Sequence, residues 1–151
     1  MYKIKEYEKK YNKEINNFII SIICEEYGFE EFRDELENEN NGRFLEECGK
    51  FWIAVDEQNN IIGTILIFKH DNEYMEIKKF YVRKEYRGKH IGYELYKKAI
   101  DFCKEQGVKK IIIGTYNKLE SAIKFYIKND FKEIVIEGKT QEGTLYMEKY
   151  I

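Results

Sequence analysis

Proline is absent from this chain, and the sequence also lacks internal repeats and low-complexity linkers. Nothing marks a boundary between domains, and 151 residues suit one domain with one core, covering residues 1–151. No apolar run approaches the roughly 20 residues that a membrane span needs, and the first residues lack the apolar block of a signal peptide. We therefore expect a soluble protein without a membrane partner.

Cysteine and histidine are also scarce. The three cysteines, Cys24, Cys48 and Cys103, are odd in number and far apart, so they form no metal-binding spacing and no obvious disulfide pairing. Since there are only two histidines, a zinc site is not expected and no metal is predicted. Cysteine usage of this kind indicates the reducing cytoplasm.

An excess of basic residues is missing as well. The net charge is −2, which argues against a nucleic-acid-binding protein. The charge is unevenly distributed, however: residues 25–47 contain ten acidic residues and two arginines, a local charge of −8, which leaves +6 for the remaining chain. Such a run is either a solvated helical face or an acidic rim that attracts a cationic substrate.

Hydrophobic periodicity predicts helices and strands along the whole chain. Helices are expected over residues 11–27, 30–39, 91–107 and 119–128. Strands are expected over residues 2–7, 51–55, 61–68, 75–82, 110–115, 131–137 and 144–150, the last two as a hairpin around Gly138 and Gly143. Strand 75–82, the helix after it and the buried strand 110–115 make a parallel β-α-β crossover. We therefore predict a mixed α/β fold, with helices packed on a largely antiparallel sheet.

The most informative segment is the turn Arg87-Gly88-Lys89-His90-Ile91-Gly92, between strand 75–82 and the helix that starts near Ile91. The first N–H groups of a helix have no internal partner, the helix dipole adds positive charge there, and glycine lets a ligand approach closely. The turn therefore predicts a phosphate-binding cradle. Lys84, Arg87 and Lys89 suit a diphosphate, although ordinary surface charge explains these three equally well. Both the dinucleotide-binding pattern G-x-G-x-x-G and the P-loop pattern are absent.

A second segment, Ser121 to Phe131, lies on a helix directly after the buried strand. Tyr126 is placed to reach the mouth where the two parallel strands end, which is where open sheets bind ligands. Taken alone, Tyr126 is one of 13 tyrosines, and core packing accounts for it.

Together, these two segments resemble the GNAT superfamily of acetyl-CoA-dependent N-acetyltransferases. Strand 76–82, the turn 87–92 and the following helix look like the family's central motif, whose usual turn is Q/R-x-x-G-x-G/A. The segment with Ala122, Tyr126 and Phe131 looks like the following motif, A-x-x-x-Y-x-x-x-G-F. The resemblance covers nearly the whole chain and implies a central sheet of about seven strands with helices on both faces. His90 and Asp130 stand where the two motifs usually have glycine.

The resemblance also implies acetyl-CoA as co-substrate and a role for individual residues. Backbone groups of Phe80, Tyr81 and Val82 would pair with the acetyl and pantetheine part of CoA. The amides of the turn, Arg87, Gly88, Lys89, His90, Ile91 and Gly92, would hold the pyrophosphate. Tyr126 matches the tyrosine that protonates the departing thiolate. Glu76 falls near the strand carboxylate that serves as general base in some members, and a salt bridge to Lys78 or to a neighbouring strand is its alternative.

The implied reaction transfers the acetyl group to a primary amine by direct attack on the thioester. In this family the first two helices form a wall of the acceptor site, so the acidic run indicates a small cationic amine as acceptor. A lysine side chain or N-terminus of a peptide or protein is the alternative acceptor. A non-catalytic acyl-CoA-binding module is the alternative function. The terminal hairpin offers an edge for a homodimer.

Overall fold

The structure is a computed structural model that describes residues 1–138 and 142–151. Its strands are β1 (Lys3–Glu6), β2 (Gly49–Val55), β3 (Ile61–His70), β4 (Tyr74–Val82), β5 (Lys110–Tyr116), β6 (Lys132–Ile134) and β7 (Thr144–Tyr150). Its α-helices are α1 (Asn12–Ile20), α2 (Arg33–Glu37), α3 (Ile91–Glu105) and α4 (Glu120–Lys128). Shorter helical segments are η1 (Lys9–Tyr11), η2 (Ser21–Glu26), η3 (Glu30–Phe32), η4 (Asn41–Glu47) and η5 (Lys84–Tyr86).

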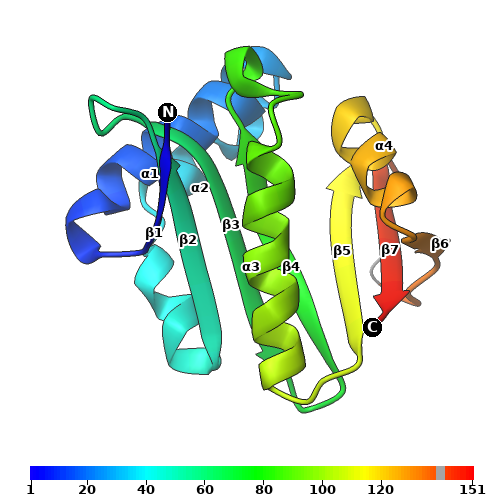
Figure 1. Cartoon of the computed structure of the whole chain (residues 1–151). Coiled ribbons are helices and arrows are strands. Elements are labelled where there is room, and N and C mark those ends of the chain that lie inside the picture. The colour runs from blue at the N-terminus through cyan, green and yellow to red at the C-terminus, as the bar shows by residue number, and fades with distance from the viewer. Residues whose placement is uncertain (139–141) are drawn as a thin grey trace.

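The described strands form one seven-stranded sheet in the order β1-β2-β3-β4-β5-β7-β6 (Figure 1). All neighbouring strands are antiparallel except β4 and β5, which are parallel and are joined through α3. This confirms the predicted mixed α/β fold, its mostly antiparallel sheet and its single crossover. The parallel pairing is short, since it joins only residues 75–77 to residues 111–113.

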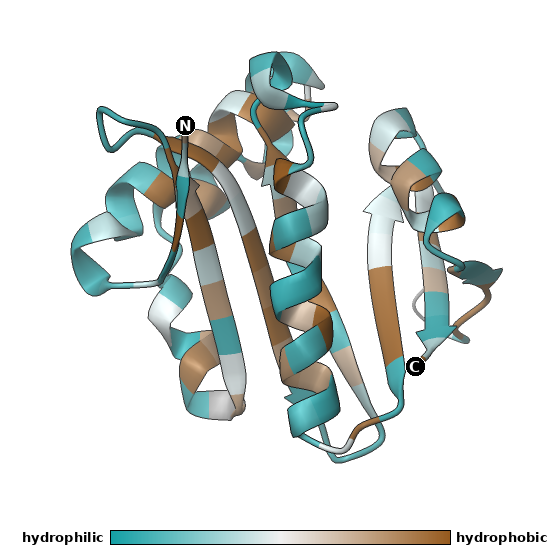
Figure 2. Ribbon diagram, viewed as in Figure 1, coloured by the Kyte–Doolittle hydropathy of each residue, from teal (hydrophilic) through white to brown (hydrophobic). Residues whose placement is uncertain are grey.

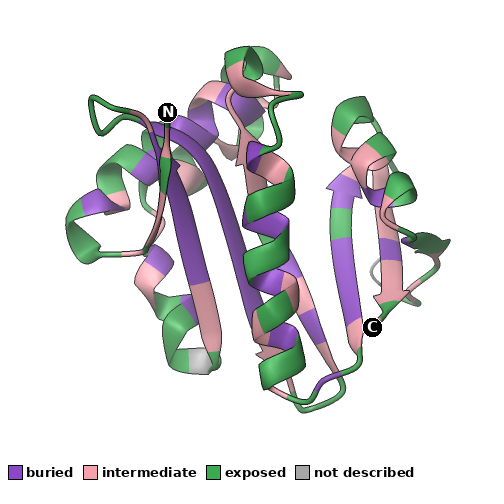
Figure 3. Cartoon of the chain, in the orientation of Figure 1, coloured by how far each residue is buried: buried purple, intermediate pink, exposed green. Residues whose placement is uncertain are grey.

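Side chains alternate between the two faces of the sheet, and each face has its own hydrophobic core. One core lies under α3 and α4 and includes Ile65, Leu95 and Tyr126. The other lies under α1 and η2 and includes Ile15 and Leu66. Hydrophobic residues therefore concentrate on the central strands (Figure 2), which are buried, whereas the outward side of α3 is exposed (Figure 3). The expected helices on both faces are present.

The predicted first helix comprises α1 and η2, and its second part widens into a π-helix. It ends before Gly28, whose φ of +81° lies in the left-handed region that favours glycine. The predicted acidic helix corresponds to η3 and α2. The predicted helix ends before residues 40–42, where a further short helix that the sequence did not predict, η4, begins. The Asn40 side chain caps η4 by accepting a hydrogen bond from the Gly42 N–H at 3.2 Å.

The C-terminal hairpin is present, but its first strand is shorter than predicted. Only Lys132–Ile134 pairs with β7, in place of the expected residues 131–137. The turn between Gly138 and Gly143 falls partly outside the described residues. Since β6 lies at an edge of the sheet, a homodimer through this edge stays a prediction.

Residues 1–138 and 142–151 contain no helix with the length and hydrophobicity needed to cross a membrane. The same residues contain no group of three His, Cys, Asp or Glu side chains placed to share a metal ion.

Candidate active site

A cavity of about 610 Å³ lies beside the end of β4, beyond the point where its pairing with β5 stops. Four segments line it: the end of β4, the loop into the first turn of α3, helix α4 with the residues that flank it, and η2 with the residue after it. The lining residues are Ile22, Tyr27, Phe80, Tyr81, Val82, Tyr86, Arg87, Gly88, His90, Gly92, Tyr93, Leu119, Ser121, Ala122, Phe125, Tyr126, Lys128 and Asn129. The glycine turn and the tyrosine helix, far apart in the sequence, thus face one space.

Strand β4 is irregular just before it reaches this cavity. Its register against β3 shifts by one residue between Thr64 and Leu66, so that one β3 residue lies opposite two residues of β4. Lys79, in this bulge, has a φ of +53°, which is uncommon for a residue with a side chain. The bulge redirects residues 80–82, all of which line the cavity.

The turn before α3 adopts a left-handed backbone at two residues. Gly88 has a φ of +77°, and His90 has a φ of +66° although it carries a side chain. The His90 carbonyl accepts the hydrogen bond of the Glu94 N–H at 3.0 Å, which makes His90 the residue that caps α3. The amides that follow it open the helix and have no intrahelical acceptor.

Gly92, in the first turn of α3, faces the cavity. A Cβ atom at this position would lie 3.5 Å from Val82 Cγ2 and 3.8 Å from Phe80 Cζ, which is ordinary contact. Glycine is therefore not required for the packing of the helix. It leaves open the space in front of the free amides, which suits a phosphate group.

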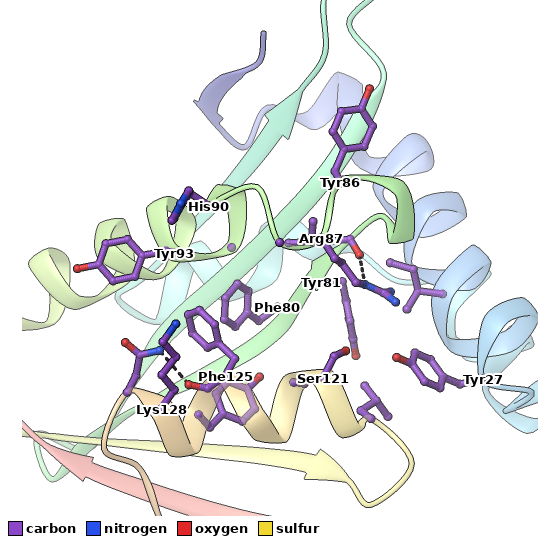
Figure 4. A pocket seen from close by; sticks show the side chains of 18 residues that line it. Tyr27, Phe80, Tyr81, Tyr86, Arg87, His90, Tyr93, Ser121, Phe125 and Lys128 are labelled. Carbon is purple, nitrogen blue, oxygen red and sulfur yellow. Dashed lines mark hydrogen bonds between the residues drawn. The ribbon is translucent and has the colours of Figure 1, made fainter.

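Arg87 is already engaged within the protein. Its Nη1 and Nη2 atoms donate to the Glu26 carboxylate at 2.6 and 2.8 Å. Its Nε donates to the Val82 carbonyl at 2.9 Å (Figure 4). Its backbone amide donates to the Lys84 carbonyl at 3.3 Å. The hydrogen bonds to Glu26 raise the pKa of Arg87. This fork ties η2 to the turn, so the guanidinium that the sequence assigns to a diphosphate is paired with a carboxylate.

Three of the predicted site residues are absent from the cavity's described lining. The Lys89 ammonium lies over the Tyr86 ring, 5.6 Å from its centroid. The Ile91 side chain is only 2% exposed and belongs to the core under α3.

Glu76, the third, lies nearer the start of β4. Its Oε1 is 2.8 Å from His70 Nε2, and its Oε2 is 3.9 Å from Lys78 Nζ. Both interactions match the structural alternative that the sequence left open, and the role of general base stays a prediction.

Tyr126 lines the cavity from α4 and is only 4% exposed. Its ring packs against Phe80, with 6.2 Å between the centroids, and against Phe131, at 5.7 Å. Burial, and then the nearby Tyr81, raise the pKa of the Tyr126 hydroxyl. None of the described residues forms a hydrogen bond with this hydroxyl. It therefore carries its proton at neutral pH and is available to a ligand.

The cavity has two different ends (Figure 4). Tyr27, Tyr81 and Ser121 lie at one end, near η2, and His90, Tyr93 and Lys128 lie at the other, near the start of α3. Neither Ser121 nor Lys128 was predicted from the sequence to belong to the site. Their seven-residue separation, which brings both to one side of α4, was the available signal.

An aromatic cluster borders the η2 side of the sheet. The ring centroid of Tyr116, at the end of β5, lies 4.9 Å from that of Phe29 and 5.7 Å from that of Phe32. Burial raises the pKa of Tyr116, and the charges of Glu35 and Glu31 contribute. The acidic run therefore reaches this cluster. Neither of these glutamates has an ion-pair partner among the described residues, and both side chains are exposed.

Known proteins share both the sequence pattern and the fold. The model of the acetyltransferase (GNAT) family matches residues 16–131. A crystal structure of a GNAT-family acetyltransferase from Staphylococcus aureus Mu50 is 33% identical, with a TM-score of 0.87 and 99% of each chain covered. A putative streptothricin acetyltransferase from Bacillus anthracis, solved with acetyl coenzyme A, is 25% identical at a TM-score of 0.64, covering 76% of this chain and 69% of that one.

Curated relatives are longer than this chain. Streptothricin acetyltransferase A of Bacillus subtilis is 33% identical over 100 residues, which cover 66% of this chain and 58% of the relative. Human N-acetyltransferase 8B is 29% identical over 96 residues, which cover 60% of this chain and 42% of the relative. The chain thus spans about half the length of these two curated proteins.

Proposed function

Because the chain belongs to the GNAT acetyltransferase family and is an acyltransferase, we propose that it transfers an acetyl group from acetyl-CoA to a primary amine. The observation that carries this proposal is the cavity itself. It joins a helix N-terminus without intrahelical acceptors, the free end of a strand and a buried tyrosine hydroxyl in one space. These are the groups that a diphosphate, an extended amide chain and a departing thiolate require.

In this proposal, acetyl-CoA lies along the cavity with its diphosphate at the start of α3. The amides from Gly88 to Gly92 would hold the phosphates, and His90 and Lys128 lie at the same end of the cavity. Since β5 stops pairing with β4 at Ile77, the edge of residues 80–82 is free to hydrogen-bond the amides of pantetheine. Arg87, which is paired with Glu26, contributes by shaping the wall.

The chemistry is a direct displacement. The neutral amine nitrogen attacks the thioester carbonyl carbon, a backbone N–H of β4 stabilises the oxyanion, and the carbon–sulfur bond then breaks. The amine loses its proton to a base, for which Glu76 acting through water is our candidate. Tyr126 donates to the departing sulfur. A thiol has a pKa near 8.5 and the Tyr126 pKa is raised, so the hydroxyl stabilises the thiolate mainly as a hydrogen-bond donor.

We further propose that the acceptor is a small cationic amine. Glu31 and Glu35 are exposed acids beside the aromatic rings of Phe29, Phe32 and Tyr116, and aromatic faces with carboxylates attract ammonium groups. Phe29 already has a cation over its ring, since Lys118 Nζ lies 5.3 Å from its centroid. Streptothricin, after which two of the similar proteins are named, serves as one member of a test panel.

The test measures free thiol release from acetyl-CoA with a panel of cationic and neutral amines and lysine peptides. We expect turnover with cationic amines, and a higher KM for them in the double variant Glu31→Gln/Glu35→Gln, because both charges are lost with little change in shape. Neutral amines are the control, since their KM should not change. CoA binding without thiol release would favour the non-catalytic module, and preference for the peptides would favour a protein acetyltransferase.

A further inference from the structure

Lys79 is a buried lysine that the proposed reaction does not use directly. Its side chain is only 11% exposed, and its Nζ lies 3.4 Å from the Glu39 carboxylate, which is 12% exposed. The same ammonium donates to the Asn41 Oδ1 at 2.5 Å, and Asn41 is completely buried. Glu39 lies between α2 and η4, and Asn41 is the first residue of η4, so the side chain fastens β4 to the chain that covers this face of the sheet.

The surrounding hydrogen bonds form a closed network. Asn41 Nδ2 donates to the side-chain oxygens of Asn12 and Asn16, both at 2.8 Å. The side-chain amides of these two α1 residues donate to the Glu39 carbonyl, both at 2.9 Å. Every fully buried polar side-chain atom of the described residues has a partner. The residues that receive the Lys79 ammonium are therefore held in fixed positions by α1.

Stability alone does not account for this arrangement. Burial lowers the pKa of Lys79 to about 8, despite the opposing charge of Glu39. Keeping the charged ammonium in this position therefore costs free energy of folding. Buried ion pairs often contribute less to stability than apolar groups of the same volume, and in some proteins they fix one conformation instead. A conformational role is thus the better explanation.

The conformation that the network fixes is the strained backbone of the bulge. Lys79 is in the left-handed region with a φ of +53°, and its carbonyl accepts a hydrogen bond from the buried Thr64 hydroxyl at 2.6 Å. The strained residue is therefore anchored at its backbone from β3 and at its side chain from the α2–η4 segment. Strain of this kind persists only where the surroundings impose it, and it concentrates at functional sites.

We propose that Lys79 is a positioning residue of the acetyl transfer: its anchored ammonium holds the β4 bulge and thereby aims the free edge of residues 80–82, with the backbone N–H on that edge, into the cavity. This proposal rests on the proposed function. Without the anchor, the bulge relaxes and the oxyanion donor moves away from the thioester carbonyl. The diphosphate grip at the start of α3 does not depend on it.

The test compares Lys79→Met with Lys98→Met, the same substitution at an exposed lysine of α3 that does not line the cavity and lies outside the network. We expect Lys79→Met to lower kcat by about tenfold to a hundredfold, the loss typical of a small misplacement, with CoA affinity kept. In the protein without ligand, its amide NMR signals for residues 80–82 should shift. Lys98→Met should leave both the turnover and these signals near those of the natural chain.

The outcomes separate the two proposals. Normal turnover and unshifted signals in Lys79→Met would overturn the role of Lys79 while leaving the acetyltransferase intact. A lower melting temperature with unchanged kcat would make Lys79 a stabilising residue only, and would also overturn it. Absence of CoA binding to the natural chain would refute the acetyltransferase, and the role of Lys79 with it. Should Lys79→Met not fold, Lys79→Gln keeps a hydrogen-bond donor and is expected to show the same selective loss of kcat.

Discussion

Substitution of Gly92 should change stability and coenzyme binding in opposite directions. A Cβ atom at this position meets only ordinary contacts, at 3.5 Å from Val82 Cγ2 and 3.8 Å from Phe80 Cζ, so Gly92→Ala and Gly92→Glu should both fold. Alanine stabilises a helix by up to about 1 kcal/mol relative to glycine, so Gly92→Ala should unfold at a slightly higher temperature. Its methyl group nevertheless enters the space in front of the amides and should weaken CoA binding.

Gly92→Glu adds a negative charge to the same space. Two unit charges about 4 Å apart interact by about 4 kcal/mol at an effective dielectric constant of 20, which corresponds to about a thousandfold in affinity. Isothermal titration calorimetry with CoA measures the affinity, and thermal unfolding of the same samples shows whether they are folded. A folded Gly92→Glu variant that bound CoA as tightly as the natural chain would refute the phosphate cradle.

Three further predictions concern other residues. Tyr126→Phe should lower kcat by about a hundredfold while CoA affinity and melting temperature stay nearly unchanged, because its hydroxyl bonds none of the described residues; unchanged kcat would remove it from the mechanism. Asp130→Gly should raise the free energy of unfolding in urea by about 0.5–1 kcal/mol without altering CoA affinity, since its φ is +69° and it does not line the cavity; a loss of stability would contradict this. Finally, burial lowers the pKa of Lys79 from 10.5 to about 8, so the unfolded chain binds more protons between these values. Relative to Lys79→Met, the natural chain should therefore gain about 3 kcal/mol in its free energy of unfolding from pH 8 to 10.5. If the unfolding free energies of the two proteins changed equally with pH, this prediction would be excluded.

The sequence predicted most of the fold because the hydrophobic patterns here are local and consistent. Ile111, Ile112 and Ile113 indicate a buried strand by themselves, and the glycines at residues 88 and 92 mark the start of a helix. These patterns did not predict η4, since its capping by Asn40 depends on a short-range hydrogen bond that competes with an ordinary turn.

The candidate site was only partly predictable, because its geometry depends on contacts between distant residues. The pairing of Arg87 with Glu26 joins positions 61 residues apart, and neither residue has a local signal for it. Likewise, the left-handed conformation of Lys79 is imposed by Thr64 and by the network around Asn41, whereas lysine itself does not favour it. The sequence therefore indicated the glycine turn and Tyr126, which line one cavity, but not the side chains that hold the site in shape.

The brevity of the parallel pairing has a mechanical consequence. Within the described chain, three residue pairs are the whole backbone ladder that joins the first four strands to the last three. A ligand that contacts β4 and α4 at the same time therefore stabilises the association of these two parts of the sheet. Coenzyme binding should thus slow amide hydrogen exchange in β5 and β7, although these strands do not line the cavity. The place where the pairing of β4 with β5 stops is therefore both the opening that the ligand enters and the contact that the ligand stabilises.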